Sequence, residues 1–224
     1  QAAPTAQAVA RARLLLDRYG IASRAAALAE ELPGGFGSLY KVYRELEEQG
    51  RVRRGHFVDG LGGAQFAWAG AVDRLRACRD AAEERDAPLT PDDVSILAVT
   101  DPANPYGSLV PWPRVADAGR ARPRRVAGAW LLLARGRPLF YVGRRGSAIL
   151  TFPDSLRDED DACTAAIRAL RRLPKAASRS MLVIEKIDGL PVDESPLAPA
   201  FRAAGFVTDY RGLVDVAAPD AARA

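Results

Sequence analysis

Basic and polar side chains gather in one short stretch of this sequence, in a pattern typical of phosphate binding. The stretch contains Ser38, Tyr40, Lys41, Arg44, Arg51, Arg53, Arg54 and His56. Lysine and arginine neutralise phosphates, and hydroxyl or imidazole groups hydrogen-bond to phosphate oxygens and base edges. Glu45, Glu47 and Glu48 lie at the far end of the same segment, where we expect them to point away from a polyanion. The pattern therefore predicts contact with DNA; the alternative is a protein–protein spacer whose charges are solvated.

Three helical patterns position the first half of this stretch. The first covers residues 5–19, between a capping Thr5 and a terminating Gly20, and the second begins after Ser23. The third covers residues 38–49 and carries the predicted contact residues on its solvent face. Its expected core positions are Leu39, Val42, Tyr43 and Leu46.

A hairpin and a fourth helix follow. Residues 51–58 read as a strand, 59–63 as a glycine-rich turn, 64–68 as the returning strand and 70–82 as a helix. Three helices followed by a two-stranded ribbon is the order of a winged helix-turn-helix, whose third helix enters the major groove while the wing reaches the backbone or minor groove. We therefore predict a winged-helix DNA-binding domain over residues 1–82.

The charge distribution supports this placement. The chain has 224 residues with 32 basic and 28 acidic side chains, and residues 1–79 hold 12 basic against 8 acidic, which accounts for the whole excess of +4. A second basic block, residues 114–145, holds nine arginines against the single acid Asp117. From this block and its surroundings we predict further DNA contacts at Arg124, Arg125, Arg144 and Arg145. Aromatic residues interleave with it; we expect Trp130 and Phe140 in the core, and the stacking of Trp112 on unpaired bases stays open.

The second half of the chain predicts an α+β domain. We place a linker at residues 83–93, an antiparallel, barrel-like sheet with helical cover at 94–218, and an unstructured tail at 219–224. Predicted strands cover residues 94–99, 125–133, 139–142, 148–152 and 181–187, with two more around 211–212, and predicted helices cover 158–174 and 196–204.

Three segments resemble one known family. The stretch GGFGSLYKVYRELEEQGRVRRGHFVDGLGGAQFAWAGAVDRLR closely resembles the winged helix of large helicase-related (Lhr-type) proteins. LAVTDPANPYGSLVPWP and GLPVDESPLAPAFRAAGFVTDYRGL are also similar to that family, so the resemblance covers nearly the whole chain. It implies the C-terminal region of a superfamily 2 DNA helicase that uses ATP, tracks along single-stranded DNA and takes part in DNA repair. The implied partners are DNA and the remaining domains of the parent helicase; a homo-oligomer is the structural alternative.

The chemistry of a helicase motor is not visible in these residues. The sequence contains no GxxxxGK[ST] phosphate loop and no DEAH-like motif, and residues 34–37 are glycine-rich without a lysine. We therefore expect no cofactor in this fragment, with ATP and Mg²⁺ implied for the parent motor alone. One histidine and two cysteines make a zinc site of the usual ligands improbable, and we expect no metal. Gln1 at the start and a sole methionine at position 181 are typical of a piece of a longer polypeptide.

A second enzymatic activity is implied by the same resemblance, because the C-terminal region of Lhr proteins is similar to a class of winged-helix DNA glycosylases. That class carries two glutamines one residue apart; here Gln65 stands alone, with Gly63 at the earlier position. Asp101, which follows a buried strand, and Asp215, on the last strand, are the other candidates. Their alternatives are a turn starter before proline and a solvated strand residue, respectively.

Three further expectations concern the environment of the chain. Cys78 and Cys163 lie far apart among alanines and leucines, which predicts buried free thiols rather than a disulfide. The sequence has no apolar run of the roughly 20 residues that would span a bilayer and no signal-peptide pattern, so we expect a cytoplasmic protein without a membrane partner.

Overall fold

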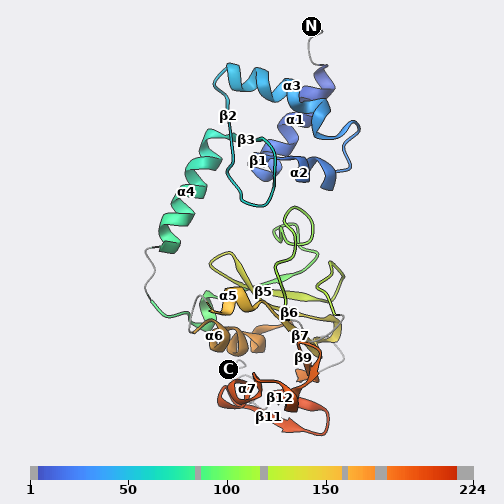
Figure 1. The fold of residues 1–224 in the computed structure, drawn as a ribbon, viewed down its shortest axis with the longest axis vertical. Helices are drawn as coiled ribbons and strands as arrows, with labels where there is room; N and C mark the ends of the chain where they lie inside the picture. Colours follow the sequence, from blue (N-terminus) through green and yellow to red (C-terminus); the bar gives the residue numbers. More distant parts are fainter. Residues whose placement is uncertain (1–4, 84–86, 117–120, 158–160, 175–180, 216–224) are drawn as a thin grey trace, which may run out of the picture. The chain divides into compact units, whose positions relative to one another are not determined.

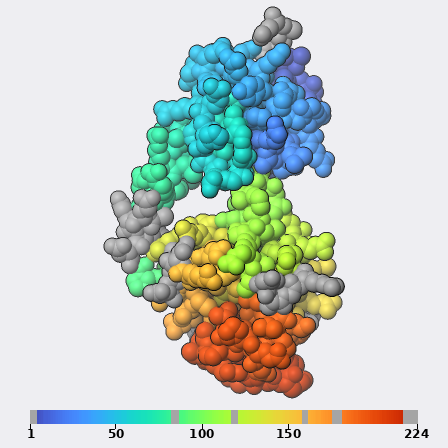
Figure 2. Space-filling view, in the orientation of Figure 1, coloured from blue at the N-terminus to red at the C-terminus, as the bar shows by residue number. Residues whose placement is uncertain are grey.

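The chain divides into two units in the computed structural model (Figure 1). Unit 1 comprises residues 1–86 and 105–111, and unit 2 comprises residues 87–104 and 112–224. Each unit is a compact body of side chains in the space-filling view (Figure 2). The structure describes residues 5–83, 87–116, 121–157, 161–174 and 181–215. The predicted tail at 219–224 lies outside them, and residues 87–93 of the predicted linker group with unit 2.

Unit 1 is a winged helix, as the sequence predicts. Its elements are α1 Ala6–Tyr19, β1 Ile21–Ala22, α2 Arg24–Ala29, α3 Gly35–Glu48, β2 Val52–Gly55, β3 Gln65–Trp68 and α4 Ala69–Glu83. The strands form an antiparallel sheet in the order β1-β3-β2, so β2 is an edge strand. The predicted caps are confirmed: Thr5 Oγ1 accepts the N–H of Ala8 at 3.2 Å, and Ser23 Oγ accepts that of Ala26 at 3.1 Å.

The core of unit 1 is built from the apolar faces of the three helices and β3. The four predicted core positions of α3 are all buried. Tyr43 stacks on Phe66 with ring centroids 5.1 Å apart, and Phe36 stacks on Tyr43 at 5.6 Å. Tyr43 also donates a hydrogen bond from its hydroxyl to the carbonyl of Ala12 at 3.1 Å, which ties α3 to α1. Leu109, from the segment 105–111, packs against the same core.

Two boundaries differ from the predicted ones. The third helix begins at Gly35, about one turn before Ser38, because Gly34 adopts a left-handed φ of 77° that starts the helix there. Ser38 consequently lies within the first turns, where its hydroxyl donates to the carbonyl of Gly35 at 2.8 Å. The wing strand ends at Gly55 rather than residue 58, because a side chain takes over the hydrogen bonds of the following residues.

Unit 2 contains two open sheets. Its strands are β4 Ser95–Ala98, β5 Trp130–Ala134, β6 Arg137–Val142, β7 Ala148–Thr151, β8 Val183–Ile184, β9 Lys186–Ile187, β10 Leu190–Pro191, β11 Phe206–Asp209 and β12 Gly212–Asp215. The larger sheet has the order β10-β9-β7-β6-β5-β4, in which β7 and β9 are parallel, and the smaller has the order β11-β12-β8. A barrel requires the two end strands to pair, and here β4 and the two-residue β10 are both edges. The α+β class is confirmed, whereas the barrel-like sheet is not, because the strands among the described residues leave both sheets open.

Helices cover the larger sheet and complete the core of unit 2. The helices are α5 Pro153–Arg157, α6 Ala162–Ala169 and α7 Ala198–Ala203, with a 3-10 turn at Leu170–Arg172. The small side chains of α6 and its Ile167 share one buried cluster with Leu132 and Phe140 of the sheet. Residues 158–160 of the predicted helix lie outside the described part of the chain.

Three predictions need correction, two for strands of unit 2 and one for Cys78 of unit 1. The predicted strand 181–187 is two strands in different sheets, because the chain turns between Ile184 and Lys186. The predicted strand 125–133 begins only at Trp130. Cys78, predicted to be buried, is exposed on α4, whereas Cys163 is half-buried; both thiols are free.

The aromatic residues of the basic block are core residues. Phe140 is fully buried, and Trp130 packs against the same cluster, as predicted. Trp112 stacks on Phe152 at 6.3 Å and meets Tyr141 edge-on at 5.9 Å, so its ring is already engaged within unit 2. Among the described residues, no helix is both long and apolar enough to cross a membrane.

Candidate nucleic-acid interface

The outer face of α3 and the edge strand β2 present the predicted contact residues. Lys41 and Arg44 are exposed on α3, on the side opposite its buried stripe. Tyr40 is half-buried, because its ring packs edge-on against Phe66 at 5.6 Å. Its hydroxyl is therefore held at the edge of the core by the ring, which fixes its position relative to the wing.

The wing strand β2 is an edge strand of its sheet among the described residues, and it carries exposed basic side chains. Val52 is the buried residue of the strand, whereas Arg53 and Arg54 are exposed. Arg51 precedes the strand and His56 follows it, and both are exposed. The structure thus brings the helix and strand residues of the predicted set into one unit.

Two of the arginines are paired with glutamates. Arg44 donates to Glu48 at 3.3 Å, and Arg54 lies 3.4 Å from Glu47. Arg54 also donates to the hydroxyl of Tyr40 at 3.4 Å, and this hydrogen bond, followed by the charge of Glu47, raises the pKa of the guanidinium. We expected the glutamates at the end of α3 to point away from a polyanion, and this prediction is wrong for Glu47 and Glu48, which pair with two of the predicted contact arginines. Exposed ion pairs contribute little, so these arginines can exchange a carboxylate for a phosphate at small cost.

Three cations of the surface stay available. Within the part of the chain that the structure describes, Lys41, Arg51 and Arg53 form no ion pair and no side-chain hydrogen bond. We call these three residues the wing cations. Among the predicted lysine and arginine contacts on this surface, these three side chains can bind phosphates without first breaking an ion pair or a hydrogen bond within the protein.

Gln65 holds the wing in shape. Its side chain is only 1% exposed. Oε1 accepts the N–H groups of Phe57 at 3.0 Å and Val58 at 2.9 Å, and Nε2 donates to the carbonyl of Val58 at 2.8 Å. The carboxamide thus replaces the backbone pairing that β2 loses after Gly55. This structural role of Gln65 was not predicted from the sequence, because its hydrogen-bond partners lie seven and eight residues away across the turn.

The wing turn depends on backbone that glycine favours. Gly60, Gly62 and Gly63 all have positive φ angles of 57–76°. Asp59 accepts the N–H of Gly60 at 2.9 Å through its carboxylate, which closes the start of the turn. Gly63, which stands where the glycosylase class has its first glutamine, is therefore part of this turn.

The two aspartates predicted as catalytic candidates are engaged locally. Asp101 accepts the N–H of Ala103 at 2.8 Å through its carboxylate, which is the geometry of a turn starter. Asp215 pairs with Arg171 at 3.0 Å, and Arg171 also lies over the ring of Phe206, 5.4 Å from its centroid. Asp101 lies in the loop after β4 and Asp215 ends β12, and these two strands belong to different sheets.

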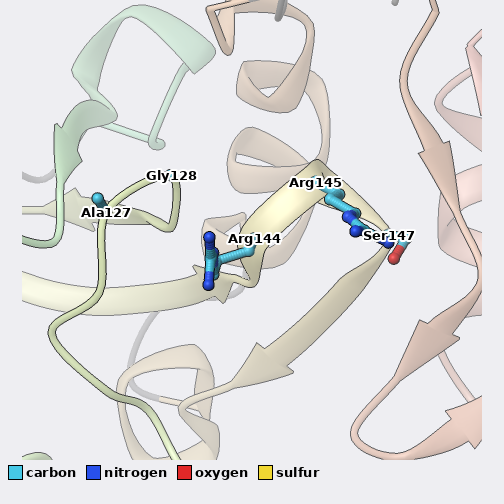
Figure 3. Close-up of a pocket in the computed structure, with 5 residues that line it drawn as sticks. All are labelled: Ala127, Gly128, Arg144, Arg145 and Ser147. Carbon is cyan, nitrogen blue, oxygen red and sulfur yellow. The ribbon is translucent and has the colours of Figure 1, made fainter.

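The arginines of the second basic block have different surroundings. Arg125 donates to the carbonyls of Asn104 at 2.8 Å and Asp101 at 3.2 Å, so it fixes the loop after β4. Arg124 is exposed, and its carbonyl accepts the hydroxyl of Tyr141. Arg144 and Arg145 line an open depression (Figure 3).

One half-buried carboxylate, Asp188, was not singled out in the sequence. Asp188 accepts the N–H of Thr151 at 2.7 Å and its hydroxyl at 2.8 Å, which joins the β9–β10 turn to β7. Burial raises the pKa of Asp188, although both hydrogen bonds from Thr151 oppose the shift. Among the described residues, no three histidine, cysteine or acidic side chains gather as a metal site would require.

Comparison with known proteins agrees with this architecture. Residues 1–87 match the family model described as "Large helicase-related protein, winged-helix domain". The chain is 40% identical over 217 residues to a protein of Mycolicibacterium smegmatis named "Lhr helicase/ probable uracil glycosylase", covering 93% of this chain and 14% of that protein. It is 38% identical over 213 residues to "Lhr helicase/uracil glycosylase" of Escherichia coli, covering 93% of this chain and 13% of that protein. The chain therefore spans about one seventh of the length of these relatives.

Proposed function

This chain belongs to the family of Lhr-type helicases, matching their C-terminal region, and from that premise we propose that it is a DNA-binding module of such a helicase. The observation that carries the proposal is the set of wing cations, which a winged helix presents on the elements that dock onto DNA. Its task is to hold single-stranded or junction DNA beside a motor that hydrolyses ATP elsewhere in the parent protein.

We propose different tasks for the helix and the wing. Lys41, near the middle of α3, is placed to meet the phosphates that border a groove entered by the helix. We propose that Arg51, which precedes the edge strand, and Arg53, on that strand, meet the backbone that flanks the groove. Such contacts fix the position of the protein on DNA and carry no sequence information, which suits a helicase that must bind any sequence.

A binding comparison tests the proposal. We expect the double variant Arg51→Ala/Arg53→Ala to bind duplex, junction and single-stranded oligonucleotides more weakly than the parent, by a similar factor for unrelated sequences, because phosphate contacts are sequence-independent. Fluorescence anisotropy measures each affinity. The matched control is Arg13→Ala/Arg74→Ala, which removes two exposed arginines of α1 and α4 outside the proposed surface. Equal affinity of the two double variants would show that the wing is not the contact.

The names of both relatives favour a second candidate function, the excision of uracil from DNA. A glycosylase needs a polar group that orients water or stabilises the sugar cation, and a pocket for the extruded base. Gln65 uses its carboxamide to hold the wing, Asp101 accepts the N–H of Ala103, and Asp215 pairs with Arg171, so all three predicted candidates already have partners within the protein. Incubating the chain with an oligonucleotide that contains one uracil, followed by hot alkali, separates the two functions: strand breakage requires base excision, whereas binding alone leaves the strand whole.

A structural role is the third candidate function, and it can be tested on the same purified chain. If the module serves to hold copies or sibling domains together, sedimentation will show an assembly and DNA affinity will be absent or insensitive to salt. Steep loss of affinity with added salt supports DNA binding instead.

A further inference from the structure

The end of α3 leads directly into the wing, so a side chain of β2 comes to lie beside the helix. Gly50 has a left-handed φ of 70°, and its N–H donates to the carbonyl of Glu47 at 2.8 Å. The N–H of Arg51 donates to the carbonyl of Leu46 at 2.9 Å. These two hydrogen bonds form a Schellman motif, which ends the helix and turns the chain back. Arg54, on the strand that follows, therefore contacts side chains of α3.

Two side chains of α3 hold the guanidinium of Arg54 at different nitrogen atoms. Nη1 donates to the hydroxyl oxygen of Tyr40 at 3.4 Å, and Nε lies 3.4 Å from Oε1 of Glu47. Tyr40 and Glu47 are about two helical turns apart, so they lie on the same face of α3. We call Tyr40, Glu47 and Arg54 the seam cluster.

The seam cluster keeps hydrogen-bond donors for a ligand. The hydroxyl of Tyr40 accepts from Arg54, and within the described part of the chain its own hydrogen has no acceptor. Nη2 of Arg54 has no hydrogen-bond acceptor among the same residues, and the side chain is 47% exposed. The Tyr40 oxygen and Nη1 are only 3.4 Å apart, and Nη1 and Nη2 share one carbon atom. One phosphate that accepts from the hydroxyl therefore also lies within reach of the guanidinium.

The core of unit 1 fixes the position of the Tyr40 hydroxyl. The half-buried ring packs edge-on against Phe66, with centroids 5.6 Å apart, and against Phe36 at 6.4 Å. A donor on an immobilised ring loses little side-chain freedom when it binds a ligand, whereas a long exposed side chain loses more. The seam cluster is therefore more strongly pre-organised than the wing cations.

We propose that the seam cluster binds one backbone phosphate of duplex DNA, with the Tyr40 hydroxyl and Arg54 donating to its oxygens while Glu47 holds the guanidinium from the other side. The inference rests on the proposed function, from which it takes DNA as the ligand. The charges of Arg54 and Glu47 cancel, so the cluster supplies directional hydrogen bonds and adds little to the salt dependence, which the wing cations set. Such a contact fixes where α3 lies along the duplex.

Removing one hydroxyl tests the donor. Tyr40→Phe keeps the ring against Phe66 and should weaken duplex binding about fivefold, because a hydrogen bond is lost. Its salt slope should equal that of the parent, because no charge is lost. The loss should be smaller when Arg54 is already alanine, since both side chains serve the same phosphate. The control Tyr210→Phe removes the hydroxyl of a tyrosine that is 93% exposed in unit 2. If the two phenylalanine variants bind equally well, the proposal is overturned.

Removing one negative charge tests the position of Glu47. Glu47→Gln keeps an oxygen for Arg54 and should bind duplex DNA roughly threefold more tightly than the control Glu45→Gln. Its salt slope should also steepen by about 0.9, because the charge of Arg54 is no longer cancelled at the phosphate. Glu45 is exposed on the same helix, and its side chain has no partner among the described residues. A gain of affinity cannot come from a damaged fold, and equal affinities and slopes of the two glutamine variants would overturn the proposal.

The wing variant separates the failure of this inference from that of the proposed function. If Arg51→Ala/Arg53→Ala weakens binding while Tyr40→Phe and Glu47→Gln match their controls, the seam cluster is rejected and the proposed function stands. If these two single variants change as expected while the wing variant matches its own control, the seam cluster is supported and the wing cations are rejected. A parent chain that binds no duplex DNA rejects both.

Discussion

Replacing Gln65 by methionine should loosen the wing of unit 1. Methionine has nearly the same length and fits the buried site, but it cannot make the three hydrogen bonds that the carboxamide makes to Phe57 and Val58. Each such bond contributes about 1 kcal/mol net, which gives about 3 kcal/mol for the set. Phe57 and Val58 are only half-buried, so water can replace part of the loss. We therefore expect the closed wing to lose about 2 kcal/mol of stability relative to the open wing, which corresponds to roughly a 30-fold change in the equilibrium between them.

Native-state hydrogen exchange measures this change directly. The amides of Phe57 and Val58 should lose about 30-fold in protection, because their acceptor is removed. The amides of β11 and β12 in unit 2 serve as the internal reference and should keep their exchange rates. Unchanged protection of Phe57 and Val58 in Gln65→Met would refute the reasoning, because it would show that another group holds the wing.

Two further positions test the backbone and the half-buried carboxylate of unit 2. Arg145→Gly should be more stable than Arg145→Ala by about 0.5–1 kcal/mol in urea denaturation, because both variants lose the arginine side chain, relief of a left-handed residue is worth about 1–2 kcal/mol, and the added chain entropy of glycine costs about 0.5–1; equal stability of the two variants would contradict the strain. Asp188→Asn keeps an oxygen for the N–H of Thr151 and tolerates the φ of 52°. Because the folded pKa of Asp188 is raised, its contribution is fully present below its ordinary value of 3.8 and declines as the pH rises through the folded value. The unfolding free energy of Asp188→Asn should therefore improve relative to the parent as the pH rises from about 3.8, and a difference that stays constant with pH would exclude this linkage.

Features set by neighbouring residues could be predicted from the sequence. Thr5 and Ser23 cap their helices, and the stripe from Leu39 to Leu46 is buried, because caps and helical periodicity depend on residues within one or two turns. The winged-helix order followed from these local signals.

Features set by distant pairing could not be predicted in the same way. The open sheet of unit 2 depends on which strands meet, and the split between β8 and β9 sends adjacent residues into different sheets. The pairing of Arg54 with Glu47 depends on how close the wing lies to α3. Cys78 sits in an alanine-rich helix that looks buried, yet most of α4 is exposed.

The same difference between local and distant interactions explains why only part of the candidate site could be predicted. The exposure of Lys41, Arg51 and Arg53 followed from their places on a helix face, just before an edge strand and on that strand, respectively. The roles of Gln65 and Arg125 did not, because their partners lie across a turn or in another loop. The left-handed backbone of Arg145 has no sequence signal, since arginine rarely adopts it.

The salt dependence of duplex binding tests the central claim most directly. With the three wing cations on phosphates, the logarithm of the association constant should fall with the logarithm of the salt concentration with a slope of about −2.7, at about 0.9 for each contact. In Arg51→Ala/Arg53→Ala the slope should shrink to about −0.9. A slope near zero in the parent chain, or an equal slope in the variant, would contradict the account.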